Sequence, residues 1–241
     1  MVIKSTKSML LLLLIAMHGF SQNVVKIQSG GSINLQGNVV ITLQNIDLDN
    51  DGSINPAVNA GRFVFKGSAN NVVQGNGTTN FDQLEIAKTG SGQLTIQTNT
   101  STRSGIWLNG GNIIANDRVI TLLGNAALNG ESEISRVIAT NDGYVQASMQ
   151  LNAPVNINPG NLGAIISSNQ DMGFTSIRRG NQQQSLAAGR TSIQRYFDIS
   201  PQNNTNLNAT LRLHYTDAEL DDQAEGAIEV YTSENFTTWT K

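Results

Sequence analysis

The chain contains no cysteine and is poor in charged and aromatic residues. Of its 241 residues, 14% are charged and 5% are aromatic, and only four are proline. The lack of cysteine excludes disulfides, thiolate metal ligands and cysteine nucleophiles. So few charges also leave little material for the polar faces of amphipathic helices. The fold must therefore depend on backbone hydrogen bonds and side-chain packing.

Histidine is almost as scarce, since the chain has only His18, near the N-terminus, and His214. A Ser-His-Asp triad would have to use His214, and the sequence has no G-x-S-x-G segment. His214 shares one face of an expected strand with Arg212, which indicates a solvated surface residue. We expect a non-enzymatic protein. The alternative is a polysaccharide-binding or polysaccharide-active β-helix protein.

The N-terminal segment has the pattern of an export signal. In residues 1–22, Lys4 and Lys7 precede an apolar run over 9–17, and small or polar residues follow. This arrangement is typical of a secretory signal peptide. The run is shorter than the roughly 20 residues that a membrane span requires. We therefore expect a secreted or cell-surface protein with no membrane span after signal removal.

The charge balance argues against two classes of partner. The formal net charge is −3, and it becomes −5 when Lys4 and Lys7 are removed with the signal. A mildly acidic surface does not favour binding to nucleic acid or to an anionic membrane. An extracellular glycan or another surface component is the partner class that remains.

Short alternating segments separated by turn residues dominate the sequence. The chain has 23 glycines, and apolar side chains recur at every second position, as half-buried strands require. The strand-like segments are 24–28, 32–36, 39–44, 62–67, 83–88, 93–98, 105–110 and 119–124. The pattern predicts an all-β fold, with an irregular β-solenoid or stacked β-sheet array over 23–151. A β-sandwich is the alternative for this half.

The residue composition changes after residue 151. Residues 152–190 include Pro154 and Pro159 and a long polar stretch, which predicts a boundary region or long loop. Strand-like segments then recur at 192–200, 208–217 and 227–233, so 191–241 is expected to form a small β-sandwich domain. The short tail after residue 233 suggests that this domain is truncated.

Two stretches carry a family resemblance. GRFVFKGSANNVVQGNGTTNFDQLEIAKTGSGQLTI (61–96) and TSIQRYFDISPQNNTNLNATLRLHYTDAELDDQAEGAIEVY (191–231) resemble segments of large exported, adhesin-like β-repeat proteins of Bacteroidetes-type bacteria. The resemblance implies a secreted or cell-surface structural protein and supplies no catalytic residues. Such proteins usually end in a type IX secretion sorting domain, which this sequence lacks. The chain is therefore either a fragment of a longer protein or exported by another route.

The same resemblance makes Arg195 and Glu219 recurring positions. We interpret them as a structural ion pair inside the expected sandwich. A buried pair of this kind should matter for stability, because loss of one partner leaves an uncompensated charge.

The segment IDLDNDGSIN (46–55) resembles the first half of a calcium-binding loop. Carboxylates at alternate positions before a glycine can converge on a hard cation. The predicted calcium ligands are Asp47, Asp49, Asp51, Ser53 through its carbonyl, and Asn55. The twelfth position holds Val58 where a calcium loop has a bidentate glutamate. The alternative is an ordinary turn at Asn50-Asp51-Gly52 with no metal.

Trp107 and Trp239 are the candidates for a sugar-binding platform. Both occupy strand-like or near-strand positions. Core packing is the commoner role for tryptophan at such positions, and it stands as the alternative.

Overall fold

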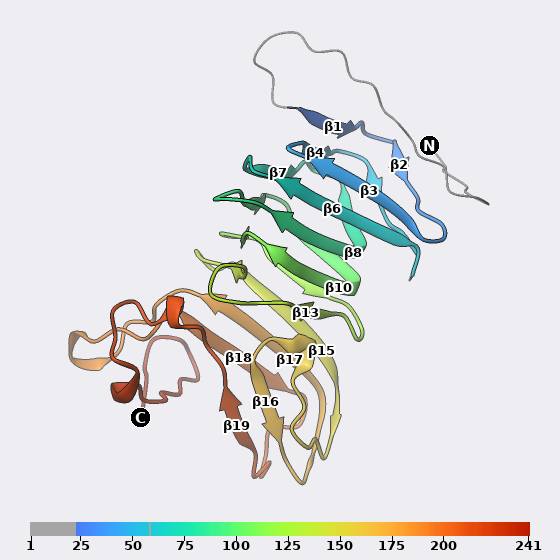
Figure 1. Cartoon of the computed structure of the whole chain (residues 1–241). Coiled ribbons are helices and arrows are strands. Elements are labelled where there is room, and N and C mark those ends of the chain that lie inside the picture. Colours follow the sequence, from blue (N-terminus) through green and yellow to red (C-terminus); the bar gives the residue numbers. More distant parts are fainter. Residues whose placement is uncertain (1–22, 58) are drawn as a thin grey trace.

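The chain winds into a β-solenoid of about six turns. The computed structural model describes residues 23–57 and 59–241, so the expected signal peptide at 1–22 and Val58 lie outside the described residues. Figure 1 shows the strands stacked in sequence order from β1 to β15. The all-β solenoid prediction is confirmed.

One face of the solenoid is a sheet of six short parallel strands, each contributed by a different coil. These strands are β1 (Val24–Ile27), β4 (Asp47–Asn50), β7 (Asn71–Gln74), β9 (Leu94–Ile96), β11 (Ile113–Ile114) and β14 (Val137–Ile138). Partner residues in this sheet are about 19 to 25 positions apart, which is the length of one coil. The coils vary in length, and this explains why no strict repeat is visible in the sequence.

The other two faces belong to one 11-stranded sheet that bends at a corner. Its solenoid members are β2 (Ser32–Ile33), β3 (Val39–Gln44), β5 (Ser53–Ile54), β6 (Gly61–Gly67), β8 (Thr78–Lys88), β10 (Thr100–Gly110), β12 (Val119–Leu122), β13 (Ala127–Asn129) and β15 (Tyr144–Asn152). The first part of β8 pairs with β5 and its second part with β6, so β8 runs through the corner. β10 does the same, pairing with β12 and then with β13.

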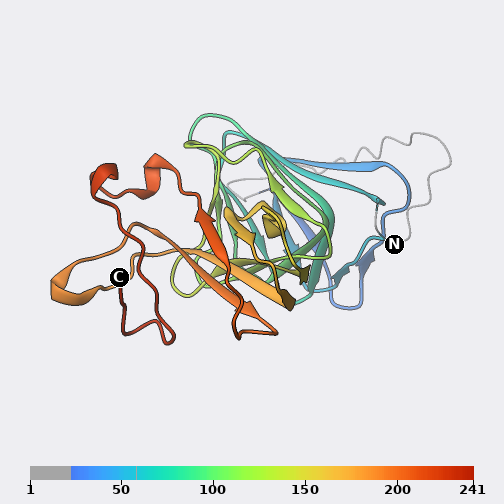
Figure 2. The ribbon, with the colours of Figure 1, turned by 90° about the horizontal axis from the view of Figure 1, so that it is seen from below.

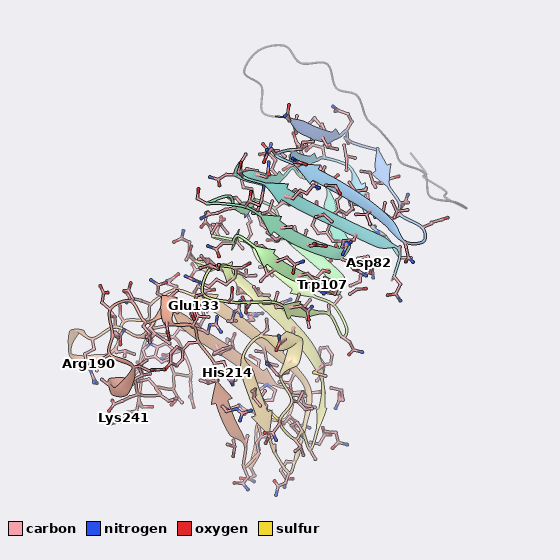
Figure 3. All side chains as sticks on the ribbon, in the orientation of Figure 1. Asp82, Trp107, Glu133, Arg190, His214 and Lys241 are labelled. Carbon is pink, nitrogen blue, oxygen red and sulfur yellow. The ribbon has the colours of Figure 1, made fainter. Side chains whose placement is uncertain are left out.

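A buried aspartate holds this corner. Asp82 is fully buried at the bend of β8 (Figure 3). Its Oδ2 accepts hydrogen bonds from the backbone N–H groups of Ala60 at 2.8 Å and Gly61 at 3.2 Å, and its Oδ1 accepts one from the Ser104 hydroxyl. These partners come from the preceding and following coils, so one carboxylate joins three coils.

The core fills the interior of the solenoid because alternate side chains point inward. Phe63, Phe65, Phe81, Leu84 and Ile86 are each at most 1% exposed. The rings of Phe63 and Phe81 meet edge to face with centroids 5.1 Å apart. Each such side chain contributes about 1.5–3 kcal/mol on burial. The apolar residues of the C-terminal strands belong to this same core.

At the C-terminal end the strands become antiparallel. β17 (Asp171–Asn181) pairs with β15, and β18 (Arg195–Pro201) pairs with β17, so both extend the 11-stranded sheet. β16 (Ala164–Ser167) and β19 (Thr210–Leu213) form a separate two-stranded sheet. Ile166 of β16 and Ile177 of β17 are fully buried in one core, and Figure 2 shows the last strands continuing from the solenoid.

Two expectations for this end were wrong. Residues 152–190 contain all of β16 and β17, so they do not form a long loop. The strand-like segment 227–233 is in no strand and lies along the protein surface after a short 3₁₀ helix. The 3₁₀ helices are η1 (Pro159–Asn161), η2 (Ala187–Gly189), η3 (Asp217–Glu219) and η4 (Glu225–Ala227). The sandwich-like packing therefore uses strands from 144–213, where 191–241 was expected to supply it.

Glycines form a column at one corner of the solenoid. Ser53 donates its N–H to the Gly31 carbonyl at 3.0 Å, and Thr78 donates to the Gly52 carbonyl at 3.0 Å. A Cβ at Gly52 would overlap the carbonyl oxygen of Gly31, and a Cβ at Gly77 would overlap that of Gly52. The coils can approach at this corner only because these residues have no side chain.

Replacement of Gly52 by alanine should therefore destabilise the protein by about 1–3 kcal/mol, the usual cost of overpacking. Circular dichroism in increasing denaturant would measure the change. Gly226→Ala is the matched control, because a Cβ there meets nothing within 4 Å. Equal midpoints for the two variants would contradict the stacking argument.

Candidate functional site

The acidic segment 46–55 is a strand followed by a turn. Asp47 and Asp49 lie in β4, Asp51 lies in the turn after it, and Ser53 lies in β5. Leu48 in the same strand is fully buried, and its neighbour Asp49 projects from the opposite, outer side. This segment is therefore not the single compact loop that a calcium site of this type requires.

Asp49 and Asp51 converge on a lysine from the preceding coil. Lys26 Nζ lies 2.6 Å from Asp49 Oδ2 and 2.8 Å from Asp51 Oδ2. Hydrogen bonds to Asp49 and then to Asp51 raise the pKa of Lys26. The hydrogen bond from Lys26, followed by one from the Asn76 backbone, lowers the pKa of Asp51. Lys26 and Asp49 are register partners, so knowledge of the coil length would have found this pair from sequence.

Asp47 faces a different neighbour. Its side chain is buried, and its Oδ1 accepts hydrogen bonds from Asn71 Nδ2 at 3.1 Å and from the Val72 backbone at 2.9 Å. Both donors belong to the next coil. Asp47 is therefore directed into the contact between β4 and β7, away from the cation that its two neighbours share.

The remaining predicted ligands have other partners. Ser53 pairs with Thr78 in the parallel sheet, and Asn55 Oδ1 accepts from Arg103 Nη2 at 2.8 Å and from Asn80 Nδ2 at 3.3 Å. Of the five predicted calcium ligands, only Asp49 and Asp51 converge, and their shared cation is Lys26. No group of three or more His, Cys, Asp or Glu in the described ranges could hold a metal ion. Calcium binding stays a prediction.

A buried lysine, Lys88, lies near Asp47. Lys88 is 5% exposed, and its ammonium donates to the Ala69 carbonyl at 2.8 Å, to the Lys66 carbonyl at 3.3 Å and to Asn71 Oδ1. Burial lowers the pKa of Lys88, while the charge of Asp47 opposes the shift. Lys88 continues the inward alternation of Leu84 and Ile86, so the sequence pattern could have indicated that this lysine is buried.

The predicted Arg195–Glu219 pair is confirmed. Arg195 donates from Nε and Nη2 to Glu219 Oε1 at 3.0 Å and 2.9 Å, and from Nη1 to the His214 carbonyl at 2.9 Å. Both side chains are buried. Burial, followed by the charge of Arg179, lowers the pKa of Arg195 against the opposing effect of Glu219. The pair connects β18 to η3.

A second buried pair lies beside the first. The fully buried Arg179 of β17 bonds Glu131 through two contacts, Nη1–Oε2 at 2.6 Å and Nη2–Oε1 at 2.7 Å. Burial alone would raise the pKa of Glu131, but the charge and hydrogen bonds of Arg179 and a bond from the Val137 backbone more than offset it. The net shift is downward, so Glu131 is held ionised.

Asn181 links these charges to the last turn of the solenoid. Its Nδ2 donates to Glu219 Oε1, and its Oδ1 accepts from the Ala139 backbone at 3.2 Å. The loop residue Glu133 adds a further connection, because its carboxylate accepts the N–H groups of Asp217 and Ala218 at 3.0 Å and 2.9 Å (Figure 3). The C-terminal strands are thus joined to the solenoid by polar as well as apolar contacts.

An open cleft of about 1020 Å³ lies beside β18 and β19, and the segment 227–239 forms part of its wall. Phe236 packs edge to face between Tyr196, with centroids 5.8 Å apart, and Trp239, with centroids 6.0 Å apart. The buried indole nitrogen of Trp239 has no hydrogen-bond partner in the described part of the chain. The cleft therefore has aromatic side chains in its wall.

The other two singled-out residues lie elsewhere. Trp107 is half-buried on the outer face of β10, since its neighbours Ile106 and Leu108 fill the core (Figure 3). His214 is exposed, as predicted. Trp107 is therefore not a core residue, and the structure does not bring it together with Trp239 in the cleft.

Comparison with protein families, curated proteins and solved structures found no match. The resemblance to exported Bacteroidetes-type proteins accordingly stays a prediction. No helix within 23–57 and 59–241 is long and apolar enough to cross a membrane.

Replacement of Arg195 by methionine should lower the free energy of unfolding by about 3–5 kcal/mol, because Glu219 would remain buried without its partner. Denaturant unfolding would measure the loss. Arg212→Met is the control, since Arg212 is exposed and forms no ion pair with the described residues. Unchanged stability of the Arg195 variant would show that the pair is not structural.

Replacement of Lys26 by methionine should increase the stabilisation that calcium provides. Without the lysine, the neighbouring carboxylates of Asp49 and Asp51 would repel each other. Calcium, which prefers carboxylate ligands, could then take the place of the lysine ammonium. Melting temperatures with and without millimolar calcium would be compared for the wild type, Lys26→Met and the exposed-site control Lys66→Met. The absence of any calcium-dependent shift in all three would contradict the calcium prediction.

Proposed function

We propose that this chain is a non-enzymatic secreted or cell-surface protein with a structural or adhesin-like role. The supporting observation is that about six stacked coils and the C-terminal strands share one continuous core. Each solenoid coil contacts mainly its neighbours, so the stack is an extended, quasi-one-dimensional element. Such an element suits a stalk or spacer that presents its end away from its attachment point.

The C-terminal end has the features of the presenting part. The Arg179–Glu131 pair ties it to the solenoid, which limits movement relative to the stalk, and the Arg195–Glu219 pair holds η3 to β18 within it. The aromatic cleft opens at this end. In this proposal, export depends on the predicted signal peptide at 1–22, and the sequence resemblance supports the same extracellular location.

The aromatic cleft also favours a second candidate function, the binding of an extracellular glycan. Aromatic rings can stack on sugar faces, and few convergent polar groups are needed to orient a ligand in such a site. Tyr196, Phe236 and Trp239 supply the rings. A polysaccharide-active enzyme is the more distant form of this candidate.

Incubation of the purified protein with a panel of polysaccharides would test both candidates. Under the leading proposal no new reducing ends or unsaturated products form, and any turnover would overturn it. Affinity electrophoresis would test binding without turnover. If the cleft binds a glycan, Trp239→Ala should abolish retardation in the gel while Trp107→Ala, on another face, should preserve it.

A further inference from the structure

We propose that Lys88 and Asn71 become joined by an intramolecular isopeptide bond, with Asp47 as the proton-transfer group. The inference concerns the interior of the solenoid and does not depend on the proposed function. It rests on three buried polar side chains that meet at one corner of the stack. Lys88 ends β8, Asn71 begins β7 and Asp47 begins β4.

The geometry places each group where the reaction needs it. Lys88 Nζ contacts Asn71 Oδ1. This oxygen is bonded to Cγ, the amide carbon that the amine would attack. Asp47 Oδ1 accepts a hydrogen bond from Asn71 Nδ2 at 3.1 Å, which puts a carboxylate on the nitrogen that would leave. The attacking amine, the amide that it attacks and the acid–base carboxylate are therefore linked by two successive hydrogen bonds.

Burial makes the neutral amine form of Lys88 easier to reach than it is in water. Asn71 is 2% exposed, and Asp47 and Lys88 are each 5% exposed. Burial lowers the pKa of Lys88, and desolvation of a lysine is a recognised way to make it nucleophilic. The next coil seals the site, because Gly111 packs against the Lys88 side chain where a Cβ would overlap it.

The reaction balances without a cofactor or oxidant. The Lys88 ammonium releases one proton to solvent, and the neutral amine attacks Asn71 Cγ. The attacking nitrogen of the tetrahedral adduct then gives up a second proton, and Asp47, which is hydrogen-bonded to Nδ2, transfers this proton to Nδ2 as the bond from Cγ to Nδ2 breaks. A new amide joins Nζ to Cγ, and the ammonia that leaves takes up the released proton as ammonium. Asp47 finishes as a carboxylate, as it began.

The bond would close residues 71–88 into a covalent ring. These residues form one coil of the solenoid, comprising β7 and β8. A cross-link of this kind restricts the unfolded chain in the way that a disulfide does. In a sequence without cysteine, it would supply the covalent staple that the solenoid otherwise lacks.

Peptide mapping of the full chain by mass spectrometry gives the decisive test. Asn71 and Lys88 lie in one expected tryptic peptide, 67–88. With the bond in place, trypsin cannot cut after Lys88, so peptide 67–103 should appear with a loss of about 17 Da, the mass of ammonia. Recovery of peptide 67–88 at its sequence mass would overturn the proposal.

A second digestion excludes other losses of ammonia, such as cyclisation at Asn76-Gly77 in the same peptide. Cleavage before Asp82 should leave segments 67–81 and 82–103 held together by the new bond. Separation of these segments would locate the lost ammonia elsewhere and overturn the proposal.

Three variants complete the experiment. Lys88→Arg retains a cation but cannot form the amide, so it should show the full sequence mass and normal cleavage after residue 88. Asp47→Asn should lose most of the cross-link because the proton carrier is gone. Lys66→Arg, whose side chain is exposed, should retain the cross-link completely. Persistence of the 17 Da loss in Lys88→Arg would refute the assignment.

Discussion

Coil stacking is the constraint on which the rest of this structure depends. Backbone pairing sets each residue beside one that is about 19 to 25 positions away. Equivalent positions of successive coils therefore lie in columns, and each column must be compatible with close approach of the backbone. The glycine column at Gly31, Gly52 and Gly77 meets this demand by having no side chains. The inward columns meet it with apolar side chains that pack against one another in the core.

The same columns determine where charge can be placed. A charged residue on an outward column finds a partner one coil away, as Lys26 does with Asp49. A charged residue at a corner is enclosed by the coils above and below, so it needs a full set of hydrogen bonds. Asp82 has three such bonds from neighbouring coils, and Lys88 has donors directed to three oxygen atoms. Polar residues in the interior therefore act as connections between coils.

Antiparallel strands end the stack of parallel coils, and Arg–Glu ion pairs occur where these strands begin. After β15 the chain no longer repeats a coil, and β17 and β18 extend the sheet through antiparallel pairing. The two buried Arg–Glu pairs lie at this transition. A buried pair gains little net stability over apolar packing, but it tolerates only one arrangement of its partners. The pairs thus specify how the last strands meet the solenoid, next to the aromatic cleft.

The sequence by itself determined the all-β solenoid class and many of its strands, because alternation and turn residues are local signals. It also pointed to Arg195 and Glu219, through a resemblance. It did not locate Lys26 beside Asp49, Lys88 beside Asn71, or Arg179 beside Glu131, because these pairs depend on coil length and on which coil lies above which. The segment 227–233 has strand composition yet forms no strand, since pairing requires a partner edge in register as well as propensity. Only the tertiary structure decided these matters, because contacts across coils are set by the cumulative length of the intervening turns.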